Sequence, residues 1–384
     1  MVLTRARRRR RAVAAIGTAL AATAVACSTS GGGEAGEAAE APLVFPGEDW
    51  AEATPAQLGI DGDLLDELAD EAEAANSDCF LVARNGRVAG EWYWRGTDAD
   101  DAHEVYSVTK SIASTLVGLA VGDGDLDLDE PVADHVPEWR DTPSDGVTVR
   151  NLLSQDSGRQ RDLGTDYLAV IAAPDRTAYS VGLGQSAPPG TTWAYSNTAV
   201  QVLEPVLSGA TGTDPADYAR DRLFEPLGMD DTRLTDDLSG RATLAFGAQT
   251  TCRDLARFGL LVLAEGRWDG EQLLPEGWVA EATAPSTELN VAYGYLWWLN
   301  QQGRIASSAL AVSADGDDRT AEGRQVPDAP TDLVWALGLG NQILQVHPAT
   351  GTIVVRIGAT DVPFGADAFT EDDAARLVTE GLDP

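Results

Sequence analysis

Lysine, histidine and cysteine are scarce in this sequence. Its 384 residues include 27 lysines and arginines, and Lys110 is the only lysine among them. There are three histidines, His103, His135 and His347. They have neither a metal-ligand spacing nor a His-Glu-x-x-His pattern, so we expect no metal and no other cofactor.

Positive charge is also scarce. The formal net charge is −34, and residues 1–26 contain six arginines and no acidic residue, so a chain without them carries about −40. Such a surface argues against nucleic acids and anionic lipids as partners.

Long hydrophobic runs are absent after residue 27, so no later segment is expected to span a membrane. Residues 1–26 combine a basic start with a short alanine-rich run ending in small residues before Cys27, which is typical of a bacterial lipoprotein signal. We expect cleavage there, a lipid on Cys27, and an exported, extracytoplasmic protein anchored to the cell membrane. A plain signal peptide and an uncleaved anchor are the alternatives. The Gly/Ala/Glu-rich segment 27–48 predicts a flexible tether.

Two cysteines remain after Cys27. In an exported protein Cys79 and Cys252 could form one disulfide, or they could be two buried thiols.

The order of hydrophobic patterns predicts an α+β fold. Residues 59–75 have helical spacing, Asn85-Gly86 separates two alternating runs as in a hairpin, and a last helix begins at Thr370. Between them lies a mainly helical stretch at about 105–285, followed by strands at 292–299, 332–339, 341–347 and 352–358. We predict one antiparallel sheet flanked by N- and C-terminal helices, with a helical subdomain inserted, in one domain covering 49–384.

The single lysine calls for an explanation because arginine meets nearly every other demand for positive charge. A buried lysine can lose its proton near neutral pH and serve as a general base, which arginine cannot do. Ser107 lies three residues earlier, so a helix would place both side chains on one face. The alternative is a chance lysine on a solvated face.

The segment after Ser107 favours burial. Ile112, Leu116 and Leu119 form an apolar stripe, and the glycines at 122 and 124 end the helix. A lysine near the start of a buried helix is costly unless it is partnered or neutral.

Tyr195-Ser196-Asn197 form a second candidate group, on a turn before a helix that starts near Thr198. The phenol could relay a proton and the amide could bind a substrate carbonyl. The alternative is a packed tyrosine with an asparagine cap.

Together these motifs resemble the serine beta-lactamase and penicillin-binding-protein superfamily, in the branch of class C beta-lactamases, family VIII esterases and 6-aminohexanoate-dimer hydrolases. The matching residues are Ser107 and Lys110 in "YSVTKS" and Tyr195 and Asn197 in "PGTTWAYSN". The resemblance implies that Ser107 is the nucleophile, Lys110 its base and Tyr195 a proton relay, with Asn197 binding substrate.

One departure from the family pattern concerns the third motif. Relatives carry Lys-Thr-Gly or His-x-Gly on a strand beside the site, and here the matching text is "ALGLGNQIL", with Leu339 near the place of the cation. A substrate carboxylate would lack that partner, unless an arginine such as Arg159 or Arg304 replaces it. A backbone N–H from Gly340, Asn341 or Gln342 could join that of Ser107 as an oxyanion hole.

The sequence therefore predicts an exported serine hydrolase that cleaves an ester or amide through an acyl-enzyme on Ser107. A D,D-peptidase or weak beta-lactamase acting on cell-wall peptides or beta-lactams is one alternative. A non-catalytic penicillin-recognising lipoprotein is the other.

Overall fold

The computed structural model describes residues 42–313, 320–360 and 368–383. The expected export signal at 1–26, Cys27 and the tether up to residue 41 lie outside the described residues. Among the helices that the structure describes, none is long and apolar enough to cross a membrane.

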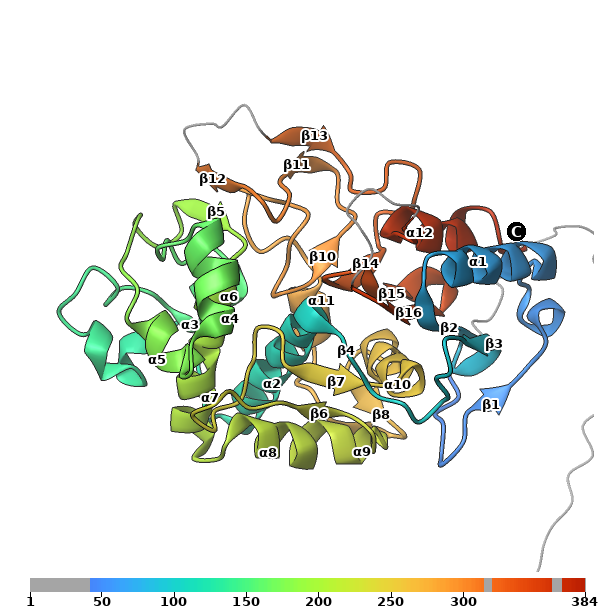
Figure 1. Ribbon diagram of the computed structural model, residues 1–384, viewed down its shortest axis with the longest axis horizontal. Coiled ribbons are helices and arrows are strands. Elements are labelled where there is room, and N and C mark those ends of the chain that lie inside the picture. The colour runs from blue at the N-terminus through green and yellow to red at the C-terminus, as the bar shows by residue number, and fades with distance from the viewer. Residues whose placement is uncertain (1–41, 314–319, 361–367, 384) are drawn as a thin grey trace, which may run out of the picture. The chain divides into compact units, whose positions relative to one another are not determined.

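A seven-stranded sheet forms the centre of the protein (Figure 1). The strand order is β1-β3-β2-β16-β15-β14-β10. Only the β1–β3 pair is parallel, and both ends of the chain contribute strands, as predicted. The strands are β1 (Ala51–Glu52), β2 (Ser77–Arg84), β3 (Arg87–Tyr93), β10 (Trp298–Leu299), β14 (Val334–Gly338), β15 (Gln342–His347) and β16 (Thr352–Gly358).

The β2–β3 hairpin forms at the dipeptide that predicted it. Asn85 and Gly86 have φ angles of 50° and 75°, which both residue types tolerate. The two inner strands β15 and β16 are buried along their whole length, because helices cover both faces of the sheet.

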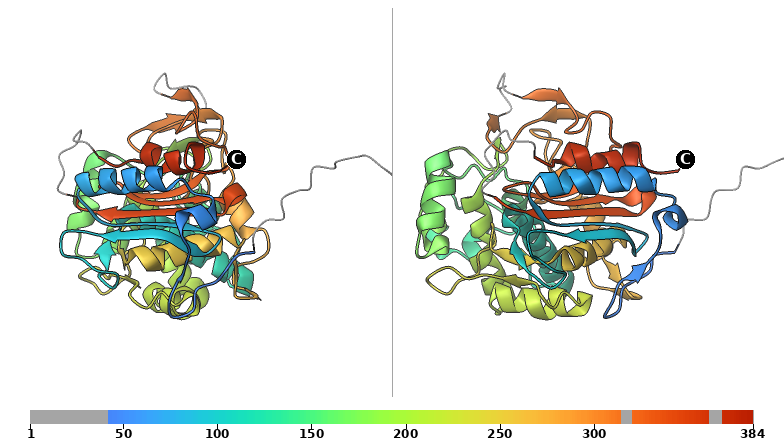
Figure 2. Two further views of the ribbon diagram at one scale, coloured as in Figure 1. Left: turned by 90° about the vertical axis from the view of Figure 1, so that its right-hand side faces the viewer. Right: turned by 45° about the vertical axis from the view of Figure 1, so that its right-hand side comes forward.

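Helices α1 (Gly62–Ala74) and α12 (Glu371–Thr379) lie side by side on one face, and α10 (Cys252–Leu263) covers the other (Figure 2). The side chain of Asp61 caps α1, and Thr370 forms a capping box with Asp373 at the start of α12. The α+β class and the flanking terminal helices are therefore confirmed.

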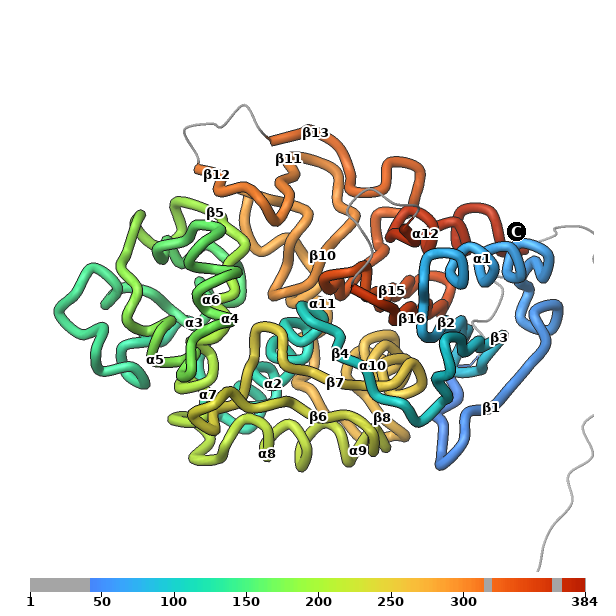
Figure 3. The backbone as a smooth tube through the Cα atoms, in the orientation of Figure 1, coloured from blue at the N-terminus to red at the C-terminus, as the bar shows by residue number. Residues whose placement is uncertain are grey.

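Helix α2 (Thr109–Asp123) runs between the inserted helical region and the sheet (Figure 3). Its residues from Thr109 to Ala120 are all buried, and Gly124 ends it with a φ of 79°. The sequence predicts a helix that includes Ser107, but Ser107 lies in the 3-10 turn η2 (Tyr106–Val108), and the α-helix begins at Thr109.

Short helices and small strand pairs make up the inserted region. The helices are α3 (Val149–Leu153), α4 (Val170–Ala172), α5 (Arg176–Val181), α6 (Asn197–Gln201), α7 (Leu203–Thr211), α8 (Pro215–Ala219), α9 (Glu225–Leu227) and α11 (Trp278–Ala282). The strand groups are β4 (His103–Glu104) with β7 (Ala248–Thr250) and β6 (Arg233–Leu234), and β8 (Arg267–Trp268) with β9 (Glu271–Gln272). Strand β5 (Thr192–Ala194) of this region pairs with β12 (Ala311–Ser313), which lies after it in the chain. Strands β11 (Gly303–Ile305) and β13 (Ala321–Gly323), both outside the region, pair with each other.

The described end of the predicted tether contacts the body of the protein. The Val44 N–H donates to the Asn85 carbonyl, and the Phe45 ring packs edge-on against Trp268. The Phe45 ring thus buries apolar surface against the body of the protein. The Gly/Ala/Glu-rich residues before it have no comparable side chain.

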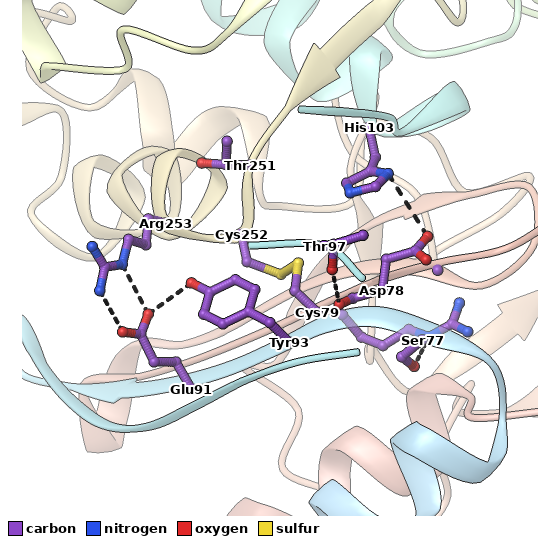
Figure 4. The surroundings of a disulfide bond; sticks show 12 residues. Ser77, Asp78, Cys79, Glu91, Tyr93, Thr97, His103, Thr251, Cys252 and Arg253 are labelled. Carbon is purple, nitrogen blue, oxygen red and sulfur yellow. Dashed lines mark hydrogen bonds and ion pairs between the residues drawn. A yellow bond between two sulfur atoms is a disulfide. The ribbon is translucent and has the colours of Figure 1, made fainter. Parts of the chain in front are cut away.

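A disulfide joins Cys79 on β2 to Cys252, the first residue of α10 (Figure 4). The two residues are 173 positions apart in the chain. Beside the bond, Arg253 donates to Glu91 on β3, which also accepts from the Tyr93 hydroxyl. The structure thus decides between the two states that the sequence left open for these cysteines.

We expect that replacing both Cys79 and Cys252 by serine lowers the free energy of unfolding by roughly 2–5 kcal/mol, because the unfolded chain loses a long closed loop. Urea unfolding measures the change. The wild-type protein in reductant should unfold like the double variant, and an unfolding midpoint that reductant does not move would contradict the disulfide.

Candidate active site

Ser107 is presented by a strained turn. Tyr106, directly before it, has a φ of 46°, which a large side chain adopts only when its surroundings impose it. The Thr109 hydroxyl donates to the Tyr106 carbonyl at 2.5 Å and accepts from the Ala248 N–H at 2.9 Å. The turn is therefore held between α2 and β7, and Ser107 is only half-buried.

Lys110 is the second residue of α2 and is buried, with 1% of its surface exposed. Its Nζ donates to Ser107 Oγ at 2.9 Å, to Asn197 Oδ1 at 2.7 Å and to the Ala245 carbonyl at 2.7 Å. The solvated-face alternative for Lys110 is therefore wrong.

The chemistry of these three partners defines where a proton can go. An amide oxygen and a carbonyl oxygen can only accept, so a neutral Lys110 amine must give its two hydrogens to Asn197 and Ala245. Its lone pair then faces Ser107, the one partner with a proton to donate. Burial lowers the pKa of Lys110 to about 7, against the opposing effect of the Asp166 charge.

Tyr195 closes the site on the other side of Lys110. The ring centroid is 4.9 Å from Lys110 Nζ, and the ring stacks on Trp298. The side chain is buried. Burial raises the pKa of Tyr195 well above its ordinary value, while the neighbouring Ser107 side chain opposes that rise. Tyr195 therefore stays protonated at neutral pH, which suits a relay better than a base.

Asn197 is the first residue of α6, behind the cap formed by Ser196. Its Nδ2 donates to the main-chain oxygen of Asp166 at 2.9 Å, which leaves Oδ1 to accept from Lys110. Asp166 was not singled out from the sequence, because it lies in an undistinguished stretch about thirty residues before its partners. The Ala245 carbonyl could not be predicted from the sequence as a partner of Lys110 either, because every residue type has a backbone carbonyl.

The third segment comes from the turn between β14 and β15. A side chain at Gly338 would place its Cβ 2.3 Å from the Val105 carbonyl, so this strand end lies against the chain that leads into Ser107. Leu339 follows with 52% of its surface exposed. Gly340 and Asn341 turn the chain with φ angles of 77° and 57°.

Gln342 belongs to the segment whose backbone N–H groups we expect to contact the substrate, and its side chain turns into the protein. Nε2 donates to the carbonyls of Leu339 and Gly358, and Oε1 accepts from the Gly358 N–H at 2.9 Å. Arg356 also donates to the Gly340 and Asn341 carbonyls. The buried amide of Gln342 therefore supports the turn.

The structure brings together four of the residues predicted from the sequence: Ser107, Lys110, Tyr195 and Asn197. The end of β14, from which the β14–β15 turn continues, lies against the chain just before Ser107. The predicted lipidation site, Cys27, lies outside the described residues.

Known hydrolases are similar to this chain in sequence. The chain is 28% identical over 294 residues to the 6-aminohexanoate-dimer hydrolase of Paenarthrobacter ureafaciens, which covers 67% of this chain and 74% of that protein. It is 33% identical over 181 residues to Esterase EstB of Burkholderia gladioli, covering 39% and 45%.

A putative 6-aminohexanoate-dimer hydrolase from Bacillus anthracis has a similar structure, with a TM-score of 0.66 at 19% identity over 83% of both chains. The Beta-lactamase family model matches residues 65–379, which include every element of the site. The chain therefore belongs to the Beta-lactamase family, as a serine hydrolase related to amidases, esterases and D-Ala carboxypeptidases.

Proposed function

We propose that this protein is an exported hydrolase that cleaves a neutral ester or amide through an acyl-enzyme on Ser107. One observation carries the proposal: Lys110 is buried, and two of its three partners can only accept hydrogen bonds. The lone pair of the neutral amine must then point at Ser107 Oγ, 2.9 Å away.

In the first step, Lys110 takes the proton of Ser107 as Oγ attacks the substrate carbonyl carbon. The resulting oxyanion is stabilised by the Ser107 N–H and a backbone N–H of the turn after β14. Tyr195, whose ring lies 4.9 Å from Lys110 Nζ, passes a proton to the leaving alcohol or amine and is reprotonated from Lys110. The bond to the leaving group breaks, which leaves the acyl group on Oγ.

Deacylation reverses these roles. Water attacks the acyl carbon, the same pair of groups removes its proton, and Ser107 leaves with a proton restored. Asn197 keeps Lys110 in place through its Oδ1.

The surroundings of the third segment support a neutral substrate. Leu339 replaces the cation that would hold a carboxylate. The arginines that could substitute for it are engaged elsewhere. Arg159 donates to Ser144 and to the Ser180, Val181 and Leu183 carbonyls while stacking on Trp139, and Arg304 donates to the Ser313 carbonyl.

Export and anchoring are supported by independent features. A disulfide persists in oxidising compartments and is rare in the cytosol. Together with the basic and apolar segment before Cys27, it favours an extracytoplasmic protein held to the membrane by a lipid on that cysteine.

A peptidase acting on D-alanyl-D-alanine is the second candidate. It is favoured by 28% identity over 147 residues to the D-alanyl-D-alanine-carboxypeptidase/endopeptidase AmpH of Escherichia coli, which covers 37% of that protein. A third candidate, a non-catalytic penicillin-recognising lipoprotein, would not react with a fluorophosphonate probe, because covalent labelling needs an activated serine.

We expect Ser107→Ala to lower the hydrolysis of a p-nitrophenyl ester by at least about 1,000-fold and to abolish fluorophosphonate labelling. The change removes one hydroxyl from a half-buried turn, so stability should stay within about 1 kcal/mol. Ester assays and thermal unfolding on the same preparations test this. Ser114→Ala, which removes a buried hydroxyl from the helix α2 that follows Ser107, is the matched control. Activity retained in Ser107→Ala would refute the nucleophile.

Lys110 should titrate near pH 7, and kcat/KM should rise with pH through the same range, because only the neutral amine can accept the Ser107 proton. Since this is the only lysine, carbon-13 placed at lysine Cε gives one NMR signal whose pH dependence reports this group alone.

Lys110→Arg keeps the charge but should be nearly as inactive as Ser107→Ala, because a guanidinium stays protonated at working pH. A titration midpoint near pH 10, or an arginine variant that retains most of its rate, would show that Lys110 is not the base.

We expect neutral short-chain esters to exceed cephalosporins and D-Ala-D-Ala peptides by at least about tenfold in kcat/KM, about 1.4 kcal/mol. Leu339→Lys should narrow that ratio by supplying a partner for the carboxylate. Leu238→Lys adds the same charge at another exposed leucine and should not. A wild-type preference for the cephalosporin would move the peptidase or beta-lactamase function to first place.

A further inference from the structure

Asp166 is a fully buried carboxylate beside the catalytic group, with 0% of its surface exposed. It lies in a π-helical segment, η5 (Gly164–Ala169). This conformation is rare in proteins, and where it occurs it is often at a functional site. The family resemblance and the sequence motifs assign it no role, so its position needs a physical explanation.

The carboxylate accepts four hydrogen bonds from the start of α6. Oδ1 accepts from Ser196 Oγ at 2.9 Å, from the Thr198 N–H at 3.0 Å and from the Thr198 hydroxyl at 2.8 Å. Oδ2 accepts from the Asn197 N–H at 2.8 Å. Every one of these donors belongs to the three residues that follow Tyr195, so the carboxylate holds the turn that carries both Tyr195 and Asn197.

The main chain of Asp166 determines which way the Asn197 amide faces. Its carbonyl accepts from Asn197 Nδ2 at 2.9 Å, so Oδ1 is directed at Lys110 Nζ, 2.7 Å away. If the Asn197 amide were reversed, its NH₂ group would face the Lys110 amine and its oxygen would face the Asp166 carbonyl oxygen. Neither pair could form a hydrogen bond as well as the pairs observed. The backbone carbonyl of Asp166 thus orients the Asn197 amide, and its carboxylate holds the turn that carries Asn197.

The negative charge of Asp166 acts on Lys110 as well. It favours the protonated amine and opposes the burial that lowers the pKa of Lys110. The titratable groups around Lys110 include Tyr195, whose ring lies 4.9 Å from Lys110 Nζ, and Tyr167, whose charge acts on Tyr195. Tyr293 packs edge-on against the Tyr195 ring. Arg161, whose charge acts on Tyr167, donates to the Tyr195 carbonyl.

We propose that Asp166 is a positioning residue that locks the Tyr195-Ser196-Asn197 turn against Lys110. The inference rests on the proposed function, since it assigns Asp166 a part in the Ser107 reaction. An asparagine in its place keeps the shape of the side chain. It presents an NH₂ where Oδ2 now accepts from the Asn197 N–H, and it removes the charge.

The test is Asp166→Asn, measured by the pH profile of kcat/KM for a p-nitrophenyl ester and by the NMR titration of the single lysine. Without the charge, both midpoints should fall by about one pH unit. The plateau of kcat/KM should fall by about tenfold or more, because the base and its partners lose their alignment.

Asp254→Asn is the matched control. Asp254 is another buried carboxylate that accepts from a backbone N–H and a threonine hydroxyl, those of Asp231 and Thr232, and the contacts described for it include none of the Ser107 group. This variant should keep the wild-type midpoints, which separates a local effect from the general cost of neutralising a buried acid.

Should Asp166→Asn not fold, Ser196→Ala removes one donor and keeps the charge. It should lower the plateau severalfold and leave both midpoints unchanged. An unchanged plateau in that variant, or wild-type midpoints in folded Asp166→Asn, would overturn the role of Asp166. Activity retained by Ser107→Ala would instead overturn the proposed function itself, so the two failures are distinguishable.

Discussion

The whole site depends on the burial of one amine. An ammonium group taken out of water costs several kcal/mol unless it is paired or gives up its proton. Here the cost is met by three oxygen acceptors from three parts of the chain: the turn at Ser107, the start of α6 and the backbone at Ala245. The same burial lowers the pKa of Lys110 to about 7, which suits its proposed role as a base. Stability and the proposed reactivity therefore depend on one environment.

The rest of the fold keeps these three parts together. Helix α2 is buried throughout its first three turns, so Lys110 can shift only if the core shifts. The sheet supplies the strand end at Gly338 that lies against the approach to Ser107. Arg356 and Gln342 tie the following turn to β16, and the disulfide ties β2 to α10 on the opposite face. Rigid elements thus position groups that lie on turns and helix ends, where exposed backbone N–H groups are available.

In the proposed function, the third segment affects which substrate is bound and not how the bond is cleaved. The exposed side chain of Leu339 cannot pair with a substrate carboxylate. The roles proposed for Ser107, Lys110 and Tyr195 do not depend on that position. We infer that substrate choice and bond cleavage are handled by separate residues here, which agrees with the range of hydrolases among the relatives of this chain.

The sequence by itself determined the features that depend on near neighbours in the chain. The Asn85-Gly86 hairpin, the caps at Asp61 and Thr370, and the approach of Ser107 to Lys110 all follow from backbone preferences within a few residues. The strand and helix order was sufficient for the α+β class. Even so, the hydrophobic pattern placed Ser107 in the helix, whereas a strained 3-10 turn holds it.

Only the tertiary structure decided which distant groups surround the base. Asn197 is 87 residues from Lys110 in the chain and Ala245 is 135, and no periodic pattern reports such distances. The pairing of Cys79 with Cys252, the inward direction of Gln342 and the four bonds to Asp166 were hidden for the same reason. Residue types state what a side chain is able to donate or accept, but only the packing of the core selects the partner.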